Sequence, residues 1–160
     1  VRQREPQDDP LAMLPDTTEP KYLSKHVVVA GFGRVGRRIC DKLEARSVPF
    51  VVIDQDREVV QRLREGKRAA VAGDASTAMA LAQAHVARAA MLIVATPDTL
   101  KTTQLAEFAR QLNPAIEIVI CARSEMEANL LEREKMGAVF LSEEALAGSV
   151  AQFVLQRLRT

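Results

Sequence analysis

The chain has 160 residues, of which 48% are hydrophobic and 27% charged, a composition typical of a folded domain with its own core. A formal net charge of +1 gives no electrostatic case for nucleic-acid binding. No apolar run approaches the roughly 18–20 residues that a membrane span requires. A start at Val1 indicates either a piece of a longer protein or a processed chain.

Residues 1–24 differ in composition from the rest of the chain and are predicted to form a linker or arm. Prolines recur through this segment, and charged and polar residues fill most of the gaps between them. Its short apolar patch, made by Leu11, Met13 and Leu14, would be able to dock on a neighbour. A single folded domain is expected over residues 25–160.

From His26 onward, short apolar runs alternate with helical patterns, such as the four-residue spacing of Val35, Ile39 and Leu43. Strands that are apolar throughout are buried on both faces, and their alternation with helices predicts a parallel sheet. We therefore expect an α/β fold: a Rossmann-like, doubly wound six-stranded parallel sheet in three layers, with its switch point above the first strand. The predicted strands are Val27–Ala30, Phe50–Ile53, Ala69–Ala72, Met91–Ala95, Glu117–Cys121 and Gly137–Leu141.

The first predicted strand leads directly into Gly31-x-Gly33-x-x-Gly36, and a helical pattern follows at once. This is the dinucleotide-binding fingerprint in its required context of strand, turn and helix. Gly31 permits the tight turn, Gly33 lets the backbone approach a pyrophosphate, and Gly36 lets the helix pack closely on the strand. The helix N-terminus offers N–H groups to phosphate, and Arg34 would lean over the same group.

Asp54 closes the second predicted strand, about 20 residues after the glycine loop. An acidic residue at that place accepts hydrogen bonds from ribose hydroxyls. Its charge would repel a 2′-phosphate, so NAD(H) or a related adenosine ligand is favoured over NADP(H). The alternative is that Asp54 only caps the following helix.

Three further strand ends would line the same crevice, because the carboxyl ends of parallel strands share one edge. Asp74 would bond an adenine edge, or it would cap the next helix, as Ser76 also would. Thr96 opens the turn that ends at Asp98, which would be an ordinary helix cap. Arg123 would meet a phosphate, with a solvated arginine or a salt bridge to a neighbouring glutamate as the alternative.

No group of residues has the spacing of a metal site, and no catalytic acid–base pair or nucleophile motif is visible. Cys40 and Cys121 are expected to be reduced core thiols. His26 and His85 are expected to be structural.

The last predicted helix, capped by Ser142, is apolar on more than one side, with Leu146, Phe153 and Leu158 among its apolar residues. Such a helix needs partners on more than one side, which indicates a subunit interface. The alternative is a helix packed on its own sheet.

Four segments together resemble a known family: Val28–Gly36, Val52–Asp56, Gly73–Ser76 and Ile120–Arg123. They are similar to regulator of potassium conductance domains (RCK, also called KTN or TrkA-N), in particular to the cytoplasmic tails of Kef-type potassium/proton antiporters of the YbaL-like branch. The resemblance implies a domain that binds NAD(H) or AMP as a regulatory ligand without redox chemistry and forms a homodimer. It also implies a place on the cytoplasmic side of the bacterial inner membrane, where residues 1–24 would link to a transmembrane antiporter part.

The resemblance also implies roles for individual residues. Gly31, Phe32, Gly33, Arg34 and Val35 would contact phosphate, Asp54 the ribose, Asp74 and Ala75 the adenine, and Arg123 the distal phosphate, while Gly36, Gln55 and Thr96 complete the candidate site.

The predicted function is a regulatory adenine-nucleotide domain that gates an attached cation/proton antiporter and is not an enzyme. The alternative is the cofactor domain of an NAD-dependent oxidoreductase, against which the missing substrate domain and acid–base pair argue. A third hypothesis is a dimerisation module without a ligand, which the intact glycine loop makes less attractive.

Overall fold

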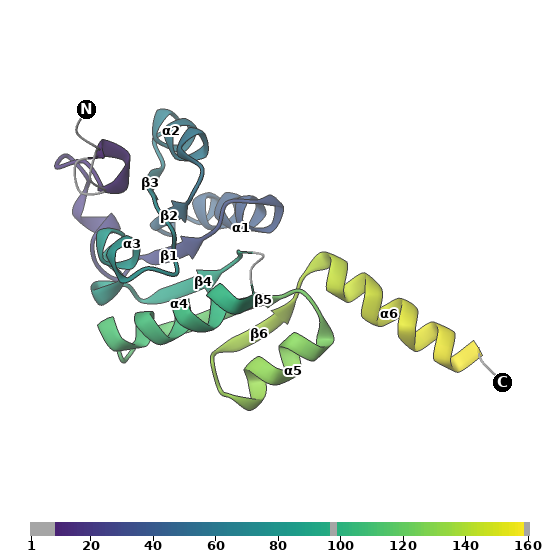
Figure 1. Ribbon diagram of the computed structural model, residues 1–160. Coiled ribbons are helices and arrows are strands. Elements are labelled where there is room, and N and C mark those ends of the chain that lie inside the picture. The colour runs from purple at the N-terminus through teal and green to yellow at the C-terminus, as the bar shows by residue number, and fades with distance from the viewer. Residues whose placement is uncertain (1–8, 97–98, 159–160) are drawn as a thin grey trace, which may run out of the picture.

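The structure, a computed structural model, describes residues 9–96 and 99–158. It contains a six-stranded parallel sheet in the order β3-β2-β1-β4-β5-β6, which confirms the predicted fold class and switch point (Figure 1). The strands are β1 (Val27–Ala30), β2 (Phe50–Asp54), β3 (Ala69–Ala72), β4 (Met91–Val94), β5 (Glu117–Ala122) and β6 (Ala138–Leu141). The α-helices are α1 (Arg34–Ala45), α2 (Arg57–Glu65), α3 (Ala78–Gln83), α4 (Thr99–Leu112), α5 (Glu125–Arg133) and α6 (Glu143–Leu158).

The predicted strands agree with the observed ones to within a residue at each end. Helix α3 is short: it ends at Gln83, and His85 adopts the left-handed conformation with φ 59°. A 3-10 turn, Val86–Arg88, then leads the chain into β4.

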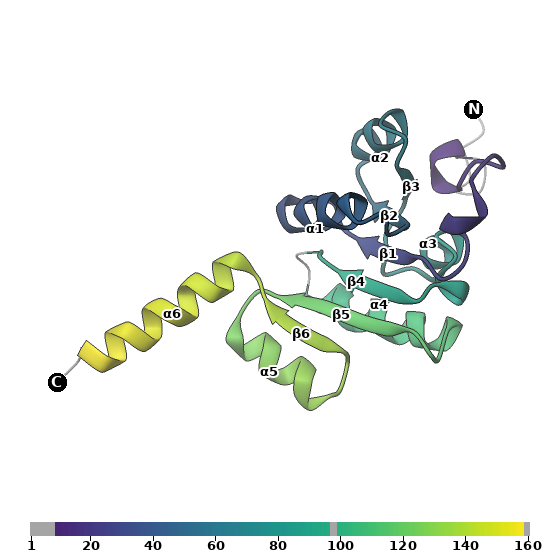
Figure 2. The ribbon, with the colours of Figure 1, turned by 180° about the vertical axis from the view of Figure 1, so that it is seen from behind.

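The sheet lies between two layers of helices, α1 and α2 on one face and α3, α4 and α5 on the other (Figures 1 and 2). Alternate residues of each central strand supply the two cores. Val29 packs in the same core as Cys40 of α1, whereas its neighbour Val28 packs in the core of Leu105 of α4. All these residues are fully buried, as expected for parallel strands that helices cover on both faces.

Helix α6 leaves the body of the domain and extends away from it (Figures 1 and 2). Ser142 caps it as predicted, since its Oγ accepts a hydrogen bond from the backbone N–H of Ala145 at 3.1 Å. Ala145 is the one buried residue that the helix has within the described part. The alternative of a helix packed on its own sheet is therefore wrong, and on β6 Phe140 remains 61% exposed.

The described part of the N-terminal segment, residues 9–24, packs on the folded body. It contains two 3-10 turns, η2 (Pro10–Ala12) and η3 (Pro20–Tyr22). Leu11 packs against the core on the α1–α2 side, and Leu14 and Tyr22 pack against the other core. Two residues of the predicted apolar patch, Leu11 and Leu14, thus pack on the domain of their own chain, whereas Met13 is exposed.

His26 is fully buried where the segment enters β1, which agrees with the expected structural role. Its Nε2 lies 2.8 Å from the carbonyl oxygen of Ala84, at the end of α3. Burial lowers the pKa of His26, so the neutral ring that donates from Nε2 is the form that the site favours.

Candidate functional site

The glycine loop joins β1 to α1 with little room for side chains. Gly31 has φ +103°, and a Cβ there would lie 3.1 Å from the backbone of Ala95. A Cβ on Gly36 would overlap the carbonyl oxygen of Gly31, so α1 can approach β1 only with glycine at this position. A Cβ on Gly33 would meet nothing within 4 Å, which leaves open space beside the N-terminus of α1.

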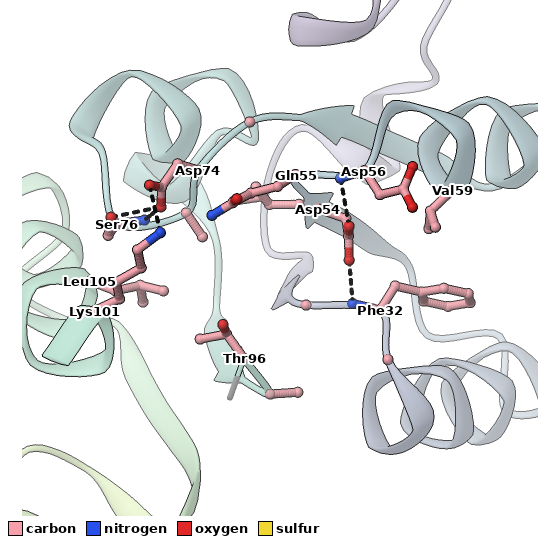
Figure 3. Close-up of a pocket in the computed structure, with 16 residues that line it drawn as sticks. Phe32, Asp54, Gln55, Asp56, Val59, Asp74, Ser76, Thr96, Lys101 and Leu105 are labelled. Carbon is pink, nitrogen blue, oxygen red and sulfur yellow. Dashed lines mark hydrogen bonds and ion pairs between the residues drawn. The ribbon is translucent and has the colours of Figure 1, made fainter. Parts of the chain in front are cut away.

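Asp54 lies opposite the loop and is held by two backbone groups (Figure 3). Its Oδ2 accepts from the N–H of Phe32 at 2.8 Å, and its Oδ1 accepts from the N–H of Asp56 at 2.9 Å. Each carboxylate oxygen can accept a second hydrogen bond, so both have capacity left for a ligand. The alternative that Asp54 caps the next helix is wrong, because Asp56 caps α2 by accepting from the N–H of Glu58.

Asp74 lies on the loop after β3, at the end of the pocket away from Asp54 (Figure 3). It accepts hydrogen bonds from the backbone and hydroxyl of Ser76, and its Oδ2 lies 3.1 Å from the ammonium of Lys101. Burial would raise the pKa of Asp74, but the Ser76 and Lys101 hydrogen bonds outweigh it and hold the pKa below its ordinary value. The helix cap is Thr77, so the alternative roles of Asp74 and Ser76 as caps are wrong.

A cavity of about 480 Å³ lies between these groups, at the carboxyl ends of β1 to β4. This volume is within the usual range for small-molecule sites. The predicted residues that line it are Gly31, Phe32, Gly33, Asp54, Gln55, Asp74, Ala75 and Thr96. Asp56, Val59, Ser76, Lys101 and Leu105 line it as well.

Three of the four remaining predicted residues line a second cavity of about 540 Å³, between the loop and the start of α6. Arg34 and Arg123 line it, with Val35 beside the loop, whereas Gly36 is buried against β1. The guanidinium of Arg34 reaches Glu143 at 3.4 Å. In this structure Arg34 therefore points away from the first cavity and towards α6.

Two other arginines of α1, Arg37 and Arg38, are exposed and lie near the loop. Arg38 lies 4.0 Å from Glu143, and Arg37 stacks over the ring of Phe32 at 5.7 Å from its centroid. Positive charge therefore gathers around the loop, but Glu143 neutralises part of it.

Lys101 is a charged residue of the site that the sequence did not predict. A signal was available in the spacing, because Lys101 precedes the apolar Leu105 by four residues, about one helical turn. The predicted cap Asp98 lies outside the described residues.

The cysteines are free thiols. Burial raises the pKa of Cys40 to about 12 and also raises that of Cys121, which is only partly buried and lines the second cavity. Within residues 9–96 and 99–158, no group of three or more His, Cys, Asp or Glu side chains is arranged to hold a metal ion.

The fold and the cavity define a class of protein: a doubly wound α/β domain with a nucleotide-type pocket at its switch point. The chain matches the TrkA-N domain over residues 27–142 and belongs to that family, which confirms the resemblance seen in the sequence. It is 30% identical over 135 residues to the putative cation/proton antiporter YbaL of Escherichia coli (strain K12), covering 84% of this chain and 24% of the relative.

Solved structures of the family share the fold. The crystal structure of the TrkA-N domain of the inner membrane protein YbaL from Escherichia coli matches with a TM-score of 0.71 and 32% identity, covering 85% of this chain and 98% of that one. The GsuK channel bound to NAD matches with a TM-score of 0.66 and 27% identity, covering 82% of this chain and 23% of the channel.

The chain thus spans about a quarter of the length of the full antiporter relative. In the described part of the chain, no helix is both long and apolar enough to cross a membrane.

Proposed function

We propose that this chain is a regulatory domain that binds an adenine nucleotide, NAD(H) or AMP, and gates an attached cation/proton antiporter. The observation that carries the proposal is Asp54, fixed by Phe32 and Asp56 so that both carboxylate oxygens keep capacity for ribose hydroxyls. The adenine would lie towards Asp74 and Ala75, and the phosphates would lie at Gly33 and the N-terminus of α1.

The matches to an antiporter and to a channel bound to NAD support the regulatory role. In this proposal the ligand acts as an effector and is not a reactant. It shifts transport only if it binds two arrangements of the protein unequally. Residues 1–24 would be the link to the transmembrane part, and residues 25–160 would be the nucleotide-binding domain on the cytoplasmic side of the inner membrane.

The ligand is tested by calorimetric titration of the chain with AMP, NAD and NADH. We expect binding, and we expect Asp54→Asn to weaken it about 10- to 150-fold, because charge-assisted hydrogen bonds are worth about 1.5–3 kcal/mol. Glu117→Gln is the matched control, since it removes the same charge from an exposed residue at the opposite end of the sheet. Absence of binding at millimolar concentrations of all three ligands would refute the proposal.

The exposed helix α6 supports the expected homodimer. Its apolar side chains and the exposed Phe140 of β6 would be covered by a second copy. The α6 residues are Leu146, Val150, Phe153, Val154, Leu155 and Leu158.

Light scattering after size-exclusion chromatography tests the dimer. Phe153→Glu should give monomers, whereas Met79→Glu, at a partly exposed position on α3, should leave the dimer intact. A wild-type chain that remains monomeric at high concentration would contradict this part of the proposal.

A further inference from the structure

We propose that the N-terminal arm (residues 9–24) is a strap whose docking on α2 is coupled to nucleotide binding. This inference rests on the proposed function, because it assigns a regulatory connection to the same site. Helix α2 carries it, since the arm contacts α2 near both of its ends and the candidate ribose carboxylate holds its N-terminus.

The first contact is an ion pair between Asp9 and Arg57, the first residue of α2. The side chain of Asp9 is largely buried at 18% exposure, and it also accepts a hydrogen bond from the N–H of Leu11 at 3.0 Å. Asp9 therefore forms the first turn of the arm and fixes that turn to α2.

The second contact is made by Arg64, at the other end of α2. Its guanidinium donates to the carbonyl oxygens of Pro10 at 3.1 Å, Leu11 at 3.3 Å and Met13 at 2.6 Å, while its Nε donates to Ala70 of β3 at 2.9 Å. Burial lowers the pKa of Arg64, and its three hydrogen bonds to the arm backbone stabilise the partly buried charge.

The contact between the arm and the start of α2 lies close to the proposed ligand site. Asp54 accepts the N–H of Asp56, Asp56 caps α2, and the next residue, Arg57, holds Asp9. The ribose carboxylate and the arm's ion pair thus lie within one turn of the same helix end. A shift of the α2 N-terminus changes both contacts together.

Coupling of this kind is reciprocal. If the docked arm holds α2 where Asp54 is oriented for ribose, releasing the arm weakens nucleotide binding, and a bound nucleotide strengthens docking. Simple electrostatics predicts the opposite sign for one variant, because Asp9→Asn removes a negative charge near the site and would favour an anionic ligand. Weaker AMP binding in Asp9→Asn would therefore indicate coupling through α2, whereas tighter binding would indicate a purely electrostatic effect.

The test uses AMP and the full chain. We expect Asp9→Asn and Arg64→Gln each to weaken AMP binding about 5-fold or more, the lower end of measured couplings between sites. In the wild type, AMP should slow hydrogen exchange of the arm by a similar factor, for example at the Ala12 N–H, which bonds to the Asp9 carbonyl oxygen at 3.0 Å. Glu19→Gln is the matched control, since it breaks an ion pair with Lys21 inside the arm and leaves α2 untouched.

The outcomes separate the two proposals. If the wild type binds AMP, but Asp9→Asn binds it equally or more tightly and arm exchange does not change, the strap is wrong and the nucleotide site stands. If the wild type binds no AMP, NAD or NADH, the proposed function and the strap both fail. Weaker binding in the Glu19→Gln control would also overturn the specific path through α2.

Discussion

Replacing Gly33 by alanine separates folding from ligand binding at the glycine loop. Gly33 lies at φ −85° and ψ −153°, extended backbone that any residue adopts. An added Cβ meets nothing within 4 Å. The domain without ligand therefore has room for the methyl group. In the proposed complex, the phosphate would occupy the same space.

The expected effects on stability nearly cancel. Alanine restricts the unfolded chain and contributes about 0.4–1 kcal/mol in favour of folding. Gly33 is also the N-cap of α1, where alanine is less favourable than glycine by a similar amount. We expect the free energy of unfolding of Gly33→Ala to stay within about 0.5 kcal/mol of wild type.

Binding should respond far more strongly. If the methyl group displaces the phosphate from one charge-assisted hydrogen bond, about 1.5–3 kcal/mol is lost, which corresponds to roughly 10- to 150-fold weaker AMP binding. Urea unfolding and calorimetric titration of the same preparation measure the two effects. Gly148→Ala is the matched control, because a Cβ there also meets nothing within 4 Å but lies on α6, away from the loop. Unchanged AMP affinity in Gly33→Ala would refute the placement of the phosphate.

Three further variants test other parts of the structure. Gly36→Ala should cost about 1–3 kcal/mol or more in a urea unfolding titration, because its Cβ would overlap the backbone oxygen of Gly31; wild-type stability would contradict the close packing of α1. Burial lowers the pKa of His26, so the unfolded chain takes up a proton first and stability should fall as the pH drops below about 6.5, by up to roughly 1.4 kcal/mol per pH unit. This fall should be smaller in His26→Gln, and equal pH profiles would argue against it. Glu143→Gln frees Arg34 for phosphate and should tighten AMP binding about 2- to 5-fold at low salt, since an exposed ion pair is worth up to about 1 kcal/mol; weaker binding would show that the pair does not compete with the ligand.

The strands and their order could be predicted because the information is local. An apolar run such as Phe50–Ile53 specifies a buried strand by itself, and the strand–glycine–helix order specifies the switch point. The same reasoning placed Asp54, since strand ends in a parallel sheet share one edge. These predictions needed no knowledge of which side chains meet.

Contacts between distant segments could not be predicted in the same way. Composition marked residues 1–24 as a linker or arm, but nothing near Arg64 in the sequence indicates that its guanidinium binds arm carbonyls more than 50 residues away. Arg34 shows the same limit, because its partner Glu143 becomes a neighbour only after β6 has joined the sheet. The partners of long, flexible side chains depend on the tertiary fold, whereas the apolar pattern of a strand is visible in the local sequence.

These long-range contacts connect the candidate site to the N-terminal arm and to helix α6. The loop, Asp54 and Asp74 belong to the β3-β2-β1 half of the sheet, whereas Thr96 and Lys101 belong to the half that begins with β4. A nucleotide in the cavity would therefore contact both halves. The first half contacts the arm through α2, and the second half leads into α6. It can act on either only by binding two arrangements unequally.

Residues of the glycine loop are linked by hydrogen bonds to the start of α2 and to the start of α6. The Phe32 N–H binds Asp54, which holds the start of α2, and Arg34 binds Glu143, which begins α6. A phosphate at the loop would compete with Glu143 for Arg34 while the ribose engages Asp54. The arm variants and Glu143→Gln should therefore change AMP affinity in opposite directions, and their effects should add if the two paths are independent.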